Sequence, residues 1–170
     1  MPVVVAPDHV HHDVATGVWC GVTEATDELP VRAEIIAAAC AAALAEELAL
    51  VGPSSPGGWP VFDLVFLGIG GDGHILSVFP GSAAFDSDAW ALAIPAPTHI
   101  EPHVERVTMH PELVTVAREV LLVAGGTSKA DVLADVLGPT REPRRWPAQV
   151  ARHERATWIL DDEAAARLSR

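Results

Sequence analysis

The sequence predicts an α/β protein built on a mostly parallel, Rossmann-like sheet with helices on both faces. Apolar segments of strand length alternate along the chain with segments of helical character. Two of the apolar segments, at 61–67 and 120–124, end in glycine-rich turns at 68–74 and 125–129. Strands that alternate with helices in this way are typical of βα units, whose strands lie parallel in one sheet.

A helix is expected over residues 31–51, because this segment is rich in Ala, Leu and Glu and contains neither proline nor glycine. We expect its apolar stripe to pack on a sheet. The stripe consists of Ile35, Ile36, Ala39, Ala43, Leu44 and Leu48. The loop at 52–58, with its prolines and glycines, ends the helix.

Strands are expected at 61–67, 90–94, 104–109, 120–124 and 157–160. The first of them is a near-continuous apolar run between turn signals, which predicts a strand buried on both faces. Helices are expected after the last three strands, namely from near Pro111, after residue 129 through Leu137, and over 162–168. Residues 1–30 are irregular apart from a strand-like segment at 17–22.

Composition excludes several classes of protein. The chain has 170 residues, 49% of them hydrophobic, which is enough for a single domain over 1–170 with a sizeable core. Its net charge of −12 would repel polyphosphate, so we expect no nucleic-acid partner. No segment approaches the roughly 18 apolar residues that span a membrane, and the N-terminus lacks the basic and apolar regions of a signal peptide. Two cysteines, Cys20 and Cys40, are too few for a disulfide scaffold and indicate the cytoplasm.

The first glycine-rich turn, Gly-Ile-Gly-Gly-Asp-Gly-His at 68–74, is a candidate catalytic site. Ligands of open α/β sheets bind outside the carboxyl ends of the strands, where this turn is expected. Here His74 is suited to act as a general base near neutral pH, with Asp72 to orient it. The alternative is a tight structural turn with a solvated aspartate and a structural histidine.

The second turn, Gly-Gly-Thr-Ser-Lys at 125–129, is a candidate phosphate site. Backbone amides, a helix N-terminus and the ammonium of Lys129, the one lysine of the chain, are together suited to bind phosphate. The alternative is an ordinary strand–helix turn with Thr127 or Ser128 as N-cap. The turn is not a Walker A loop, and neither turn has a full Gly-x-Gly-x-x-Gly, so a dinucleotide fold is not indicated.

Other polar residues carry weaker signals. Taken alone, Arg106 is expected to be a surface arginine. The cluster of His9, His11 and His12 has the atoms to bind a metal, but no carboxylate or cysteine follows at a known ligand spacing. We therefore expect no metal site.

A longer segment, Phe-Asp-Leu-Val-Phe-Leu-Gly-Ile-Gly-Gly-Asp-Gly-His-Ile-Leu-Ser-Val-Phe-Pro-Gly at 62–81, resembles the signature of the 6-phosphogluconolactonase family. Three further segments agree with the family in order and spacing. They are the Arg-x-Thr strand at 104–109, the strand and Gly-x-x-Lys turn at 120–129, and the Pro-Ala and Thr-Trp-x-Leu-Asp motifs within 147–161. The similarity runs from about Ala33 to the C-terminus.

The resemblance implies a catalytic role for the first turn. His74 would activate water against the lactone carbonyl of 6-phosphogluconolactone, and Asp72 would support His74 or contact the sugar. Gly70, Gly71 and Gly73 would shape the turn, so that local amides stabilise the oxyanion.

The resemblance also implies that Arg106, Gly125 and Lys129 bind the substrate through its 6-phosphate. Positive charge would then be needed only at the phosphate site, which is compatible with the negative net charge of the chain. Hydrolysis of an activated ester requires no metal or organic cofactor, and the product, 6-phosphogluconate, places the enzyme in the pentose phosphate pathway.

The N-terminal segment departs from the family pattern. Family members carry Ser-Gly-Gly and Gly-Asp-Glu-Arg motifs on their first strands, and neither motif occurs here, so the chain is expected to be N-terminally shortened, with 1–30 divergent. The sheet edge exposed by the missing strands would be covered by a homodimer partner or by a strand from residues 1–22.

Two alternatives to the lactonase stay open. One is a catalytically impaired remnant that still binds sugar phosphates. The other is an enzyme like the glucosamine-6-phosphate deaminases of the same superfamily. The deaminase branch has a Phe-Asn-Glu-Pro-like segment where this chain has Ser-Val-Phe-Pro-Gly-Ser at 77–82, and the chain contains no asparagine.

Overall fold

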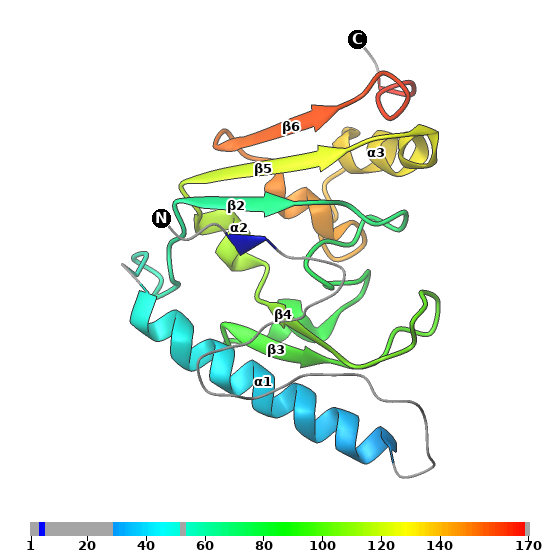
Figure 1. The fold of residues 1–170 in the computed structure, drawn as a ribbon. Coiled ribbons are helices and arrows are strands. Elements are labelled where there is room, and N and C mark those ends of the chain that lie inside the picture. The colour runs from blue at the N-terminus through cyan, green and yellow to red at the C-terminus, as the bar shows by residue number, and fades with distance from the viewer. Residues whose placement is uncertain (1–3, 6–28, 52–53, 169–170) are drawn as a thin grey trace.

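The structure is a computed structural model that describes residues 4–5, 29–51 and 54–168. It contains a four-stranded parallel sheet and a separate two-stranded antiparallel sheet, with helices packed on both (Figure 1). The α/β class with a mostly parallel sheet is therefore confirmed.

The large sheet has the strand order β1-β2-β5-β6, and all of its strands are parallel. Its strands are β1 (Val4–Val5), β2 (Leu64–Leu67), β5 (Glu119–Ala124) and β6 (Ala156–Leu160). Val65 pairs with Val120, which pairs with Ala156, so the carboxyl ends of β2, β5 and β6 lie at one edge. The predicted strands at 61–67, 120–124 and 157–160 are confirmed, with β2 shorter than expected.

One face of this sheet forms the main core. Val65 and Leu67 of β2 and Val120 and Leu122 of β5 are all buried. They pack with side chains of α2 (Glu112–Val116), α3 (Ala130–Leu137) and the 3₁₀ helix η3 (Pro147–Ala151). Each such side chain contributes about 1.5–3 kcal/mol by leaving water. The helices predicted near Pro111 and up to Leu137 are thus confirmed.

The opposite face of the large sheet is more open. Val123 and Ile159, which pair in register, are 38% and 50% exposed. Phe66 of β2 points to the same side and is only half-buried, so the prediction of a strand buried on both faces is wrong for β2. The physical reason is that α2, η3 and α3 pack together in the core on one face.

The long helix α1 (Leu29–Val51) packs mainly against the small sheet, and its Leu48 also joins the core of the large sheet (Figure 1). Ala37, Ala41 and Leu48 form its buried stripe. Their i, i+4 and i+11 spacing places them on one side of a helix, and the small alanines allow close approach to the sheet.

The predicted stripe of this helix is wrong in its first half. Ile35 is 63% exposed and Ile36 42%, and Ala39 is exposed as well. Of the remaining residues Leu48 is buried and Leu44 is half-buried. An Ala-rich helix has apolar residues all around it, so the sequence pattern selects its buried face poorly.

The small sheet consists of β3 (Ala91–Ile94) and β4 (Arg106–Met109), which confirms the strands expected at 90–94 and 104–109. These strands are antiparallel, with Leu92 opposite Thr108, and so they form no βα unit. A parallel crossover needs a dozen or more residues and usually a helix, whereas the connection at 95–105 is short and rich in proline.

Residues 162–168 are turns and not the predicted helix. The amide of Ala165 donates to the carbonyl of Asp161, but the amides of Ala166 and Leu168 then donate to carbonyls only three residues back. The Asp161 carboxylate also accepts the amide of Ala164 at 2.7 Å, which favours a local turn over a continuing helix.

The edge of β2 is paired with β1, in the register Val4 to Val65 and Val5 to Phe66. A strand from residues 1–22 at this edge is therefore confirmed. The strand-like segment at 17–22 and the cysteine at 20 lie outside the described residues. None of the described helices combines the length and the apolar character that a membrane crossing requires.

Candidate active site

The turn at 68–74 follows β2 directly and therefore lies at the carboxyl edge of the parallel sheet (Figure 1). Its backbone is closed by two hydrogen bonds. The Gly70 amide donates to the His74 carbonyl at 2.9 Å, and the Gly73 amide donates to the Gly70 carbonyl at 3.1 Å. Gly73 has φ of +81°, a conformation that favours glycine. The glycines thus fold the chain so that Asp72 and His74 come together.

Asp72 and His74 form a close pair. Nδ1 of His74 lies 2.6 Å from Oδ1 of Asp72, and the same oxygen accepts the His74 amide at 3.1 Å. Both side chains are about four-fifths buried. The predicted pairing within the turn is confirmed in its geometry. When Nδ1 carries the hydrogen, Nε2 is left as the basic nitrogen of the ring.

A second histidine, His99, contacts the other oxygen of the same carboxylate. Its Nε2 lies 2.9 Å from Oδ2 of Asp72. Partial burial by itself raises the pKa of the Asp72 carboxyl, but the hydrogen bonds from His74 and His99 outweigh it and hold that pKa well below its usual range. Asp72 is therefore a carboxylate throughout the neutral range.

Sequence reasoning missed His99. It lies 27 residues beyond Asp72 in the proline-rich connection between β3 and β4, and it belongs to no motif. The one signal in the sequence was that a histidine without an assigned role lies in a connection that follows a strand.

Phe79 and Arg106 complete this side of the site. The Phe79 ring is 4.7 Å from the His74 ring and 5.6 Å from the His99 ring, and the Arg106 guanidinium lies 5.6 Å from its centre. Arg106 is half-buried, which differs from the surface position expected of it alone. It donates from Nη2 to the Pro102 carbonyl, and its buried Nε finds no acceptor among the described residues. A cation is thus placed beside the histidines.

Thr108 holds β4 to the first turn. Its buried hydroxyl donates to the Leu76 carbonyl, only two residues beyond His74. The Arg-x-Thr strand therefore fixes both Arg106 and the segment after the turn.

Lys129 joins the two glycine-rich turns. Its Nζ donates to the Ile69 carbonyl at 2.7 Å, so the ammonium lies against the first turn. No side-chain hydrogen bond caps the 3₁₀ helix η2 (Thr127–Lys129) or α3. Thr127 and Ser128 are therefore not the N-caps that the alternative interpretation required.

Asp161 already occupies part of the second turn. Its carboxylate accepts the Gly126 amide at 2.8 Å, and a β-carbon at Gly125 would lie only 2.7 Å from its Oδ2. Hydrogen bonds from the amides of Ala164 and Gly126 hold the pKa of the Asp161 carboxyl below its usual range. Sequence reasoning missed this contact, which reduces the number of amides open to a phosphate.

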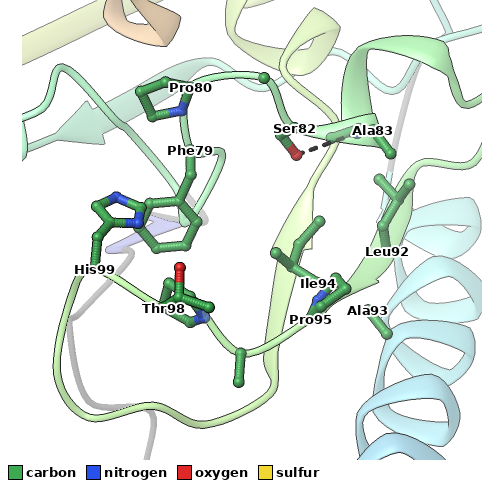
Figure 2. A pocket seen from close by; sticks show the side chains of 14 residues that line it. Phe79, Pro80, Ser82, Ala83, Leu92, Ala93, Ile94, Pro95, Thr98 and His99 are labelled. Atoms are coloured by element: carbon green, nitrogen blue, oxygen red, sulfur yellow. Dashed lines mark hydrogen bonds between the residues drawn. The ribbon is translucent and has the colours of Figure 1, made fainter.

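A cavity of about 360 Å³ lies beside the site, between residues 79–84 and residues 92–99. Figure 2 shows the rings of Phe79 and His99 at one wall, with Leu92 and Ile94 at another. The residues that reach into it are mostly apolar. His99 and Phe79 thus belong both to this cavity and to the surroundings of Asp72.

Within the described parts of the chain, no three His, Cys, Asp or Glu side chains are grouped as metal ligands would be. The histidines at 9, 11 and 12 lie outside those parts.

Fold and site together define a class, an α/β protein whose parallel sheet carries a hydrogen-bonded Asp–His pair at its carboxyl edge. Within this class, the chain belongs to the family described as glucosamine-6-phosphate isomerases/6-phosphogluconolactonase, whose model matches residues 8–159.

Relatives in this family are similar over most of the chain. The 6-phosphogluconolactonase of Mycobacterium leprae is 35% identical over 129 residues, which are 75% of this chain and 52% of that protein. The 6-phosphogluconolactonase of Homo sapiens is 40% identical over 110 residues, which are 64% of this chain and 42% of that protein. The chain thus spans about half the length of the curated relatives it matches.

Solved structures of 6-phosphogluconolactonases have a similar fold. The 6-phosphogluconolactonase of Trypanosoma brucei matches with a TM-score of 0.66 and 31% identity, over 86% of this chain and 57% of that one. The enzyme of Leishmania guyanensis matches with a TM-score of 0.69 and 26% identity, over 81% of this chain and 55% of that one.

Proposed function

We propose that this protein hydrolyses 6-phosphogluconolactone to 6-phosphogluconate. The observation that carries the proposal is the 2.6 Å contact between His74 Nδ1 and Asp72 Oδ1 at the carboxyl edge of the sheet. A histidine oriented by a carboxylate is suited to remove a proton from water near neutral pH. The family and its lactonase relatives support this reaction over other uses of such a pair.

In the proposed reaction, His74 Nε2 takes a proton from water as the water oxygen attacks the lactone carbonyl carbon. The bond between that carbon and the ring oxygen then breaks, and the protonated His74 returns the proton to the departing ring oxygen. Asp72 stabilises the imidazolium that forms between the two steps. The amides of Gly71 and Asp72, which have no acceptor within the described residues, are the candidates for stabilising the oxyanion.

Arg106 and Lys129 are the proposed ligands of the 6-phosphate. Both cations lie beside the turn that holds His74, one through the Phe79 ring and the other through the Ile69 carbonyl. Charge-assisted hydrogen bonds from such groups are stronger than neutral ones. Gly125 contributes by allowing close approach of the chain. No metal or organic cofactor is part of the proposed reaction.

We also propose a location and an oligomeric state for the enzyme. A phosphorylated lactone carries charge and does not cross a lipid bilayer unaided, so we place the protein and its substrate together in the cytoplasm. A homodimer that covers the edge of the large sheet beyond β1 is also proposed, because no further strand pairs with β1 among the described residues.

A catalytically impaired protein that binds sugar phosphates is the second candidate. It is favoured by one observation, the Asp161 carboxylate in the second turn, which competes with a phosphate for the Gly126 amide. A deaminase activity has less support, since a glucosamine-6-phosphate deaminase matches with a TM-score of only 0.50 over 62% of the chain.

The test is the rate at which purified protein removes 6-phosphogluconolactone, compared with spontaneous hydrolysis in the same buffer. We expect an acceleration that His74→Ala abolishes and that the exposed control Glu163→Gln retains. A wild-type rate equal to the blank, with the phosphorylated sugar still bound, would establish the impaired protein instead. Release of ammonia from glucosamine 6-phosphate would favour the deaminase.

A further inference from the structure

We propose that His99 is a positioning residue that holds the Asp72 carboxylate in place and divides its charge between two histidines. This inference rests on the proposed function, because it assigns His99 to the step in which His74 takes a proton. It adds a residue from the connection between β3 and β4 to the Asp72–His74 pair, which the sequence places within the turn after β2.

The geometry assigns one imidazole to each carboxylate oxygen. His74 Nδ1 lies 2.6 Å from Oδ1, and His99 Nε2 lies 2.9 Å from Oδ2. A carboxylate held at one oxygen alone can turn about its terminal bond, since that torsion has broad minima. Held at both oxygens, the Asp72 carboxylate keeps the plane in which Oδ1 meets the His74 ring.

The position of the His99 ring is itself supported. It meets the Phe79 ring edge-on at 5.6 Å, with an angle of 83° between the planes. The Phe79 ring also lies 4.7 Å from the His74 ring. One aromatic side chain therefore contacts both histidines that hold the carboxylate (Figure 2 shows Phe79 and His99).

The charged and polar groups around His99 determine how its removal would change the proton affinity of His74. Asp72 faces it directly, while His74 lies across the carboxylate and Arg106 lies across the Phe79 ring. On its own segment His103 contacts the Pro97 carbonyl and Glu105 accepts the Ala96 amide, and Glu101 is exposed.

A hydrogen bond from His99 draws negative charge toward Oδ2 and away from Oδ1. Without it, Asp72 would stabilise the protonated His74 more strongly. His74 would then lose its proton only at higher pH.

Kinetics on the full chain test this assignment. His99→Ala should lower kcat about 3- to 30-fold with KM little changed, and should move the acidic limb of the pH profile up by about half a pH unit. The amide of His99→Gln can still donate to Oδ2, so this variant should retain most of the wild-type kcat and most of the wild-type pH profile. The matched control is His103→Ala, which removes a histidine of the same segment that does not contact Asp72.

A double-mutant comparison separates positioning from a merely structural role. In an Asp72→Asn background, His99→Ala should have no further effect on kcat, because it acts through the carboxylate. An equal loss in both backgrounds would overturn the proposal. So would an effect on KM alone, which would place His99 in contact with substrate in the neighbouring cavity.

A measurement without substrate keeps this inference independent of the proposed reaction. NMR detection of the imidazole nitrogens should show the His74 titration midpoint moving up by about half a pH unit in His99→Ala and not in His103→Ala. An unchanged His74 titration overturns the role of His99. An inactive wild-type protein with the expected titration overturns the lactonase alone.

Discussion

Gly70 and His74 are so close that a β-carbon at position 70 would overlap Nδ1 and Cε1 of the imidazole. The same atom would lie 2.7 Å from Oδ1 of Asp72. The close contact between Asp72 and His74 therefore requires that residue 70 have no side chain.

Replacing this glycine should separate the pair. Gly70→Ala is expected to push the His74 ring off Asp72 and to lower kcat about 100- to 10,000-fold, which is the typical contribution of a positioned general base. Gly68→Ala, at the start of the same turn, is the control, because a β-carbon there meets nothing within 4 Å. Steady-state kinetics on both variants make the comparison, and equal activities would show that the close approach is unimportant.

The phosphate assignment of Lys129 is tested by comparing two substrates. Lys129→Met should lower kcat/KM for 6-phosphogluconolactone about 10- to 100-fold, since a charge-assisted hydrogen bond contributes about 1.5–3 kcal/mol. Hydrolysis of the unphosphorylated gluconolactone should be little changed. Arg118→Gln removes an exposed cation that pairs with Asp63 and should affect neither substrate. A loss of the same size on both lactones would assign Lys129 to holding the Ile69 carbonyl.

Gln149 should be important for stability. Its side chain is fully buried, its amide nitrogen donates to the Val136 and Thr140 carbonyls, and its oxygen accepts the Glu142 amide at 2.6 Å. Gln149→Leu leaves the Glu142 amide without its acceptor, while Arg152 Nη1 still donates to the Val136 and Thr140 carbonyls. Urea unfolding should therefore show a loss of about 1–3 kcal/mol. Glu142→Gln keeps the backbone amide and is expected to be nearly neutral.

Stability should fall in mild acid because of His110. Burial lowers the pKa of this histidine in the folded protein, and Nε2 has no partner among the described residues. The unfolded chain then binds the proton first. The free energy of unfolding therefore has its full value above about pH 6.5, which is the pKa of a histidine in the unfolded chain. It decreases as the pH falls toward the lower pKa of His110 in the folded protein, by at most about 1.4 kcal/mol per pH unit.

His110→Gln should flatten this dependence, as measured by urea unfolding at several pH values between 5 and 7.5. The variant removes the titrating group and retains a polar side chain next to Trp59, on which the His110 ring stacks at 4.3 Å. A pH dependence that is the same in both proteins would exclude His110 as its source.

Local features of the fold were predictable. Strand β2 follows from an apolar run between Pro60 and Gly68, and β5 from an apolar run that ends at Gly125. The pairing of Asp72 with His74 follows from their positions in one tight turn. The direction of β3 and β4 was not predictable from their patterns, because an apolar strand fits a parallel or an antiparallel partner.

The contacts that sequence reasoning missed join segments far apart in the chain. Asp161 reaches the Gly126 amide across 35 residues, and Lys129 reaches the Ile69 carbonyl across 60. Each depends on strands lying side by side in the large sheet, and no local spacing encodes it.

The α/β class, the family and the turn that holds Asp72 and His74 can be inferred from the sequence alone, because each rests on residues adjacent in the chain. The buried face of α1 and the contact of His99 with the Asp72 carboxylate instead depend on how distant segments pack. A helix with alanine on every side has no preferred face until a sheet packs against it. Likewise, a histidine 27 residues from its partner gains a role only when β3 and β4 bring their connection to the edge of the sheet.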